Sequence, residues 1–135
     1  MPTLAKKALL VALLAVVLAA GLAAQTKPSP APLLGTWLLE VNAGGESYFL
    51  PLELKLVEEK LAGGVSEQSG MFTNVPLTNF EWDGVTLKFA AKIPTPPDGA
   101  ERICKFEFKL DQAKLVGTLT IEEMGMTVPV TGTKK

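Results

Sequence analysis

The sequence contains no histidine. Histidine is the commonest general base near neutral pH and the commonest metal ligand, so its absence removes the leading candidate for each role. The single cysteine, Cys104, has no partner for an internal disulfide and no histidine to activate its thiol. No serine lies in a Gly-x-Ser-x-Gly motif, and no calcium-loop or phosphate-cradling glycine spacing occurs. We therefore predict a protein that is not an enzyme, with no catalytic residue, no metal site and no cofactor.

The chain lacks the excess of basic residues that binding to a polyanion would require. The chain has 13 Lys and Arg against 14 Asp and Glu, a net charge of −1, and Arg102 is its one arginine. Because these residues form no cluster, we expect no nucleic acid among the partners. A helical pattern is missing as well, since no window beyond residue 33 carries an apolar period of 3.6 residues.

The first two dozen residues have the three parts of a secretory signal peptide. Lys6 and Lys7 precede an apolar run at 8–18, and small residues follow at 19–21. Cleavage after Ala23 would place Gly21 at position −3, where a small residue is favoured. We predict a signal peptide at 1–23, a periplasmic or secreted location, and no membrane span after cleavage.

Residues 24–33, AQTKPSPAPL, hold three prolines among small and polar residues. This composition predicts an extended, disordered linker. The folded domain is then expected to occupy residues 34–135. A domain of about 100 residues buries enough apolar surface to fold without a disulfide.

From residue 36 onward the apolar residues recur with a period of two, which is typical of strands with one buried face. Asp83-Gly84 matches a two-residue hairpin turn, and Pro76 predicts an edge, a bulge or a late start in its strand. The inward-facing sets include Leu56, Val85 and Cys104, the last as a small buried hydrophobe. The eight predicted strands cover residues 36–41, 49–57, 60–67, 72–82, 85–93, 102–110, 114–123 and 126–133.

Two segments of the predicted strands have similar sequences. The segment LKLVEEKLAGGV at 54–65 aligns with FKLDQAKLVGTL at 108–119, an offset of 54 residues. Either a repeated hairpin or the convergence of two similar hairpins explains it, and both favour a meander. Eight short strands joined by short turns predict an antiparallel up-and-down barrel, since closure removes the two exposed edges. An open β-sandwich is the alternative.

The Gly35-x-Trp37 motif on the first strand of such a meander resembles the lipocalin superfamily in its broad sense, which includes fatty-acid-binding proteins and avidins. The run from GTW to KLAGGV looks closest to the start of an avidin. The resemblance implies a barrel closed near Trp37, with Lys134 or Lys135 from the last strand over the indole ring. Biotin binders use several tryptophans and fatty-acid binders use an arginine pair, whereas this chain has two tryptophans and one arginine. The resemblance therefore implies a fold and not a ligand.

Aromatic residues cluster in the earlier part of the domain. We interpret four of them as candidates for binding a ligand or a partner, with core filling as the alternative: Tyr48, Phe72, Phe80 and Trp82. Two functions follow from the sequence. One is an exported barrel that holds a lipid-like, apolar or amphipathic ligand inside. The other is a fully packed structural or interaction domain that recognises a protein through its loops or through a patch formed by Phe80 and Trp82.

Overall fold

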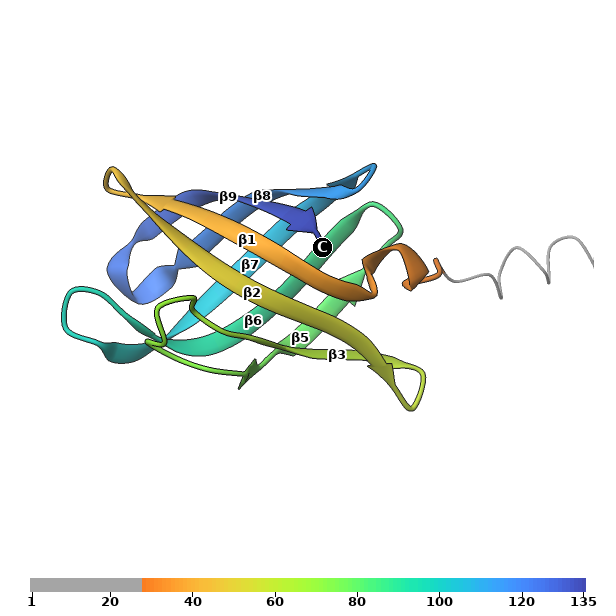
Figure 1. Cartoon of the computed structure of the whole chain (residues 1–135), viewed down its shortest axis with the longest axis horizontal. Helices are drawn as coiled ribbons and strands as arrows, with labels where there is room; N and C mark the ends of the chain where they lie inside the picture. Colours follow the sequence, from red (N-terminus) through yellow and green to blue (C-terminus); the bar gives the residue numbers. More distant parts are fainter. Residues whose placement is uncertain (1–27) are drawn as a thin grey trace, which may run out of the picture.

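The structure, a computed structural model, describes residues 28–135. Nine antiparallel strands form one sheet that curls into a nearly closed barrel (Figure 1). The predicted signal peptide at 1–23 and residues 24–27 of the predicted linker lie outside the described residues. Within 28–135, no helix has the length and apolar character needed to cross a membrane.

The strands follow one another around the sheet in the order β4-β3-β2-β1-β9-β8-β7-β6-β5. Strands β1 and β9 pair side by side, with Trp37 opposite Lys134 and Val41 opposite Val130. The strand bounds are β1 Gly35–Ala43, β2 Glu46–Val57, β3 Lys60–Val65, β4 Val75–Pro76, β5 Thr78–Trp82, β6 Thr86–Thr95, β7 Ala100–Asp111, β8 Lys114–Ile121 and β9 Met126–Lys134. Two short 3-10 turns, η1 (Ala31–Leu33) and η2 (Glu122–Met124), precede β1 and connect β8 to β9.

The all-β antiparallel barrel is confirmed, but the predicted count of eight strands is wrong. The predicted strand at 72–82 is divided into β4 and β5, because the chain leaves one neighbour for another at this point. Strand β4 pairs with β3, whereas β5 pairs with β6. Pro76 has no N–H group with which to extend the ladder to β3. The register of β5 shifts between Thr78 and Glu81, where Asn79 has a positive φ of 55°.

This division leaves a seam in the barrel between β4 and β5, which are the two ends of the sheet. The Leu77 N–H donates to the Gly63 carbonyl across 3.0 Å and links the connection between them to β3. The barrel is therefore closed by a short crossing segment rather than by a full ladder.

The predicted inward faces form the interior. The core consists of Leu39, Val41, Leu50, Leu52, Leu54, Val65, Leu87, Phe89, Ala91, Ile93, Cys104, Phe106, Phe108, Leu115, Leu119, Ile121 and Val130, together with Leu33, Trp37, Phe72 and Leu77. Two predictions are wrong, since Leu56 is 43% and Val85 is 57% exposed. Leu56 lies where the β2–β3 hairpin extends beyond the barrel, and Val85 lies in the turn before β6 (Figure 1).

The start of the domain also differs from the prediction. The segment 28–33 was expected to be part of an extended linker, yet it contains the turn η1, and Leu33 has no exposed surface. An apolar side chain at the end of a barrel gains free energy when it is buried against the core. The folded domain therefore includes at least Leu33, and its boundary at residue 34 is corrected.

The similarity between segments 54–65 and 108–119 has a structural counterpart. Gly63 lies opposite Leu54 in the β2–β3 pair, and Gly117 lies opposite Phe108 in the β7–β8 pair, at the same offset of 54 residues. A Cβ atom at either glycine would overlap the carbonyl oxygen of Glu53 or Glu107 on the neighbouring strand. Both hairpins thus depend on a close backbone approach that only glycine permits.

Candidate functional site

One end of the barrel is closed by residues from its two terminal segments. The Trp37 indole N–H donates to the Leu33 carbonyl across 2.8 Å, and both side chains are fully buried. The Lys134 ammonium lies 5.5 Å from the centre of the Trp37 ring and donates to the Pro32 carbonyl across 3.1 Å. These contacts join η1, β1 and β9 into a plug.

The opposite end holds a cavity of about 360 Å³. Its inner wall includes Leu50, Ile93, Cys104, Leu119 and Ile121, which come from β2, β6, β7 and β8. Its mouth is formed by the β1–β2 turn, the loop before β4, the β6–β7 loop and η2, which lie together at one end of the barrel in Figure 1. The lining is predominantly apolar.

The distribution of side-chain size along two strands explains why space remains at this end. Phe89, Phe106 and Phe108 stack deeper in the barrel, with the Phe89 and Phe106 ring centres 4.9 Å apart. Two residues further toward the mouth, β6 has Ala91 and β7 has Cys104. Because these small residues follow the aromatic layer, the interior is filled on one side of it and hollow on the other.

Two carboxylates line the mouth. The Tyr48 hydroxyl donates to Glu46 across 2.8 Å, and this hydrogen bond, with burial and the charges of Glu46 and Glu67, raises the pKa of Tyr48. The side chain of Glu67 accepts hydrogen bonds from the Ser69 hydroxyl and from nearby backbone N–H groups, which lower the pKa of Glu67. These hydrogen bonds therefore favour the anionic form of Glu67.

Arg102 stabilises the β6–β7 loop beside the cavity. Its guanidinium makes two hydrogen bonds to the Asp98 carboxylate, at 2.8 and 2.9 Å, and a third to the Thr95 hydroxyl at 2.7 Å. The hydrogen bonds from Arg102, together with one from the Ala100 backbone N–H, hold the pKa of Asp98 well below its usual range. The one arginine of the chain is thus engaged by the protein itself.

Cys104 lines the inner wall and has no exposed surface. Burial raises the pKa of its thiol to about 11, against the smaller opposing effect of the Arg102 charge. The thiol is neutral at physiological pH and contributes apolar surface to the cavity.

The structure divides the four predicted binding residues between the two ends. Tyr48 and Phe72 line the cavity. Phe80 and Trp82 line a separate groove near the closed end, where the Trp82 indole N–H donates to the Ser29 carbonyl across 3.1 Å. The Phe80 ring also packs against Phe89, with ring centres 5.8 Å apart.

Two methionines at the mouth escaped the sequence interpretation, Met71 and Met124, whereas the alternation places Met126 inside, as observed. Met71 lies in an irregular loop, and Met124 lies in η2. An alternation of period two cannot identify binding residues in loops and turns. The only indication in the sequence is the side-chain type, since flexible thioethers are suited to binding surfaces.

Residues 28–135 contain no group of three or more His, Cys, Asp or Glu side chains arranged to hold a metal ion. Comparisons of this protein with models of known families, with curated proteins and with solved structures find no match.

Proposed function

We propose that the protein is a non-enzymatic binding protein that holds a small apolar or amphipathic molecule in the cavity at the open end of its barrel. The observation that carries the proposal is an apolar space of about 360 Å³ in a barrel whose other end is plugged. Small-molecule sites are concave, mostly apolar and typically about 300–1,000 Å³ in volume. The cavity corresponds to about a dozen non-hydrogen atoms at ~30 Å³ each.

The proposal includes export and a relationship to the lipocalin superfamily at the level of fold. The N-terminal sequence favours export. The contact of Lys134 with the Trp37 ring, at the closed end of a cup, is the arrangement that the resemblance implies.

The alternative function, a fully packed structural or interaction domain that recognises a protein through its loops or through Phe80 and Trp82, has weaker support. The indole N–H of Trp82 is bound by the chain's own Ser29 carbonyl, and Phe80 packs on the core. A partner at this site would have to displace the segment at 28–30.

A fluorescence titration with the neutral apolar probe N-phenyl-1-naphthylamine tests the proposal on the purified protein. Val128 lines the cavity, whereas its neighbour Thr127 on β9 is exposed. We expect Val128→Trp, which fills the cavity, to weaken probe binding at least about tenfold, and Thr127→Trp to leave it within about twofold. Thermal melting checks that both variants fold, and Met126→Phe serves as a milder filling variant. Equal binding to all variants would show that the cavity is not the site.

A further inference from the structure

We propose that the ligand of this cavity carries a cationic head group, as a long-chain ammonium does, and that Glu46, Tyr48 and Glu67 receive it at the mouth. This inference rests on the proposed function, because it names the class of molecule that the same cavity takes. Its basis is the distribution of charge around the mouth.

Glu46 and Glu67 are the two charged residues that line the cavity itself. Both accept hydrogen bonds from neutral groups, Glu46 from Tyr48 and Glu67 from Ser69. Within residues 28–135, neither carboxylate forms an ion pair with a lysine or an arginine. The cavity therefore opens between two negative charges that no described cation neutralises.

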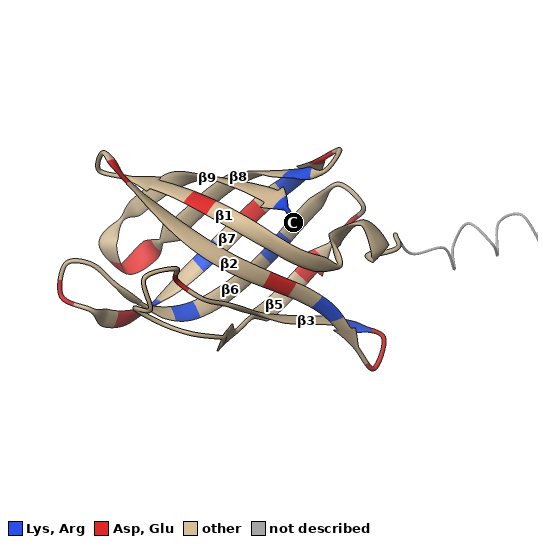
Figure 2. Ribbon diagram, viewed as in Figure 1, with Lys and Arg blue, Asp and Glu red and all other residues tan. Residues whose placement is uncertain are grey.

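The basic side chains at this end are directed to other carboxylates. Arg102 pairs with Asp98 at 2.8 Å, and Lys105 pairs with Glu122 at 2.7 Å. Lys92 lies 4.0 Å from Glu101. Figure 2 shows the resulting predominance of acidic residues on the β1–β2 turn, on the β6–β7 loop and on η2.

Binding of a ligand with an anionic head group at this mouth would be unfavourable. Both terminal nitrogens of Arg102 already bind Asp98, and its Nε is buried without a hydrogen-bond partner. An anion would also face the unneutralised Glu46 and Glu67, and juxtaposed like charges disfavour a wrong partner.

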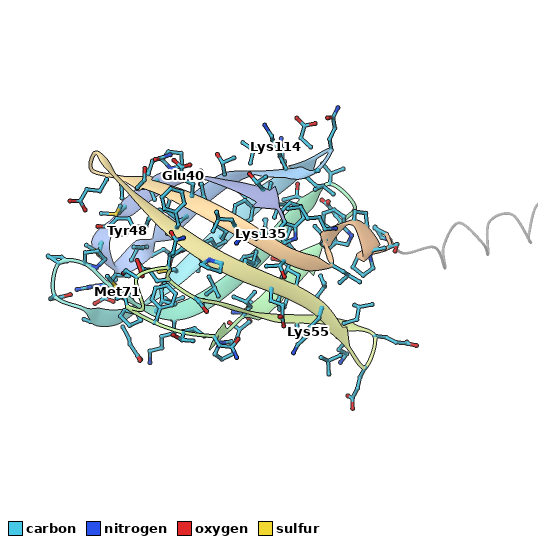
Figure 3. All side chains as sticks on the ribbon, in the orientation of Figure 1. Glu40, Tyr48, Lys55, Met71, Lys114 and Lys135 are labelled. Carbon is cyan, nitrogen blue, oxygen red and sulfur yellow. The ribbon has the colours of Figure 1, made fainter. Side chains whose placement is uncertain are left out.

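Tyr48 adds an aromatic ring to the two carboxylates. Its hydroxyl donates to Glu46 across 2.8 Å, and Glu67 lines the same cavity, so the three side chains border one mouth. Figure 3 shows Tyr48 and Met71 at this same end, on β2 and on the loop before β4. Carboxylates combined with an aromatic face are the chemistry that attracts an ammonium group.

The size of the cavity matches a chain of about a dozen carbons, with its head group left at the mouth. A matched series with one 12-carbon chain therefore separates the head group from the tail: dodecylammonium chloride, dodecanol and sodium dodecanoate. Each compound is titrated by calorimetry into the purified protein at concentrations at which it stays monomeric in solution.

We expect dodecylammonium to bind about tenfold more tightly than dodecanoate, with dodecanol between them. Glu46→Gln and Glu67→Gln keep the hydrogen-bond acceptors and remove the charge. Each should weaken dodecylammonium binding roughly twofold to fivefold and leave dodecanol binding unchanged. Glu101→Gln removes a carboxylate that is near Lys92 and does not line the cavity, so it should change neither affinity.

Equal affinity for the three compounds, or preference for dodecanoate, would overturn the head-group inference and leave the proposed function standing. An ammonium preference that survives in both glutamine variants would overturn the assignment to Glu46 and Glu67. If none of the three compounds binds while N-phenyl-1-naphthylamine does, the head-group inference fails and the proposed function stands; if the probe does not bind either, both fail.

Discussion

Trp37 is the residue on which the closed end of the barrel depends. Its side chain has no exposed surface, and its indole N–H satisfies the buried Leu33 carbonyl. We predict that Trp37→Phe lowers the free energy of unfolding by about 2–3 kcal/mol, because it leaves this carbonyl unpaired and opens a void. Lys134→Met should cost about 0.5–1 kcal/mol through loss of the cation–π contact.

Denaturant unfolding of both variants measures these two costs, with Lys135→Met as the matched control. If Trp37→Phe and Lys134→Met lower the free energy of unfolding equally, the Lys134 ammonium contributes as much to stability as the buried indole N–H.

The Cys104 thiol offers a second test at this scale. Because burial raises the pKa to about 11, very little thiolate is present at pH 8. We predict that iodoacetamide modifies the native protein at least about tenfold more slowly than the denatured chain at this pH. Bound dodecanol should slow the reaction further, since Cys104 lines the cavity. Rapid modification of the native protein would contradict the buried position.

The same pKa has a consequence for stability. The folded pKa lies above the unfolded value of about 8.5, so the neutral thiol favours the folded state. This contribution is fully present below that unfolded pKa and is lost as the pH rises toward about 11. As the pH rises above 9, the free energy of unfolding should therefore fall less for Cys104→Ala than for the natural chain. Urea unfolding of both proteins over this pH range measures the difference.

Among the strands, the two hairpins related by 54 residues have a shared requirement for glycine. Alanine at Gly63 or Gly117 would press a methyl group into a backbone carbonyl, which has little freedom to move. We predict a loss of about 2 kcal/mol or more for each variant in denaturant unfolding. Gly132→Ala is the control, because its methyl group would meet the movable side chains of Leu39 and Leu115. A similar loss in all three variants would remove the special role of the two hairpins.

Alternation of apolar residues predicts the long strands well, because each has one face inside the barrel and one outside. It fails at strand ends such as Leu56 and Val85, where the chain extends beyond the core or turns. It also fails at β4 and β5, because the choice between β3 and β6 as a neighbour is made by distant parts of the chain.

For the whole molecule, the seam between β4 and β5 is the weakest part of the barrel wall. Strand β5 is at an end of the sheet and has an interrupted register with β6. We predict that backbone amides in β4 and β5 exchange with deuterium sooner than those of the other strands. Hydrogen exchange with mass spectrometry measures this difference. Equal protection of β5 and β6 would mean that the barrel opens as one unit.

The candidate site was predictable only in part. Tyr48 and Phe72 could be chosen as members of an aromatic cluster in the earlier part of the domain, but Phe80 and Trp82 were chosen on the same grounds and lie at the other end. Side-chain type indicates what a residue can bind, whereas its location at one end of a barrel depends on strand order and register.

The sequence by itself determined the all-β architecture and most of the interior, because period-two alternation specifies which side chains avoid water. It also excluded histidine-dependent chemistry through composition alone. Tertiary structure decided the number of strands, the inclusion of Leu33 in the core, and the cavity. These features arise where residues far apart in the chain meet. The aromatic layer fills one part of the interior, and the small residues beyond it leave space. The start of β2 and the loop before β4 bring two unneutralised carboxylates to its mouth.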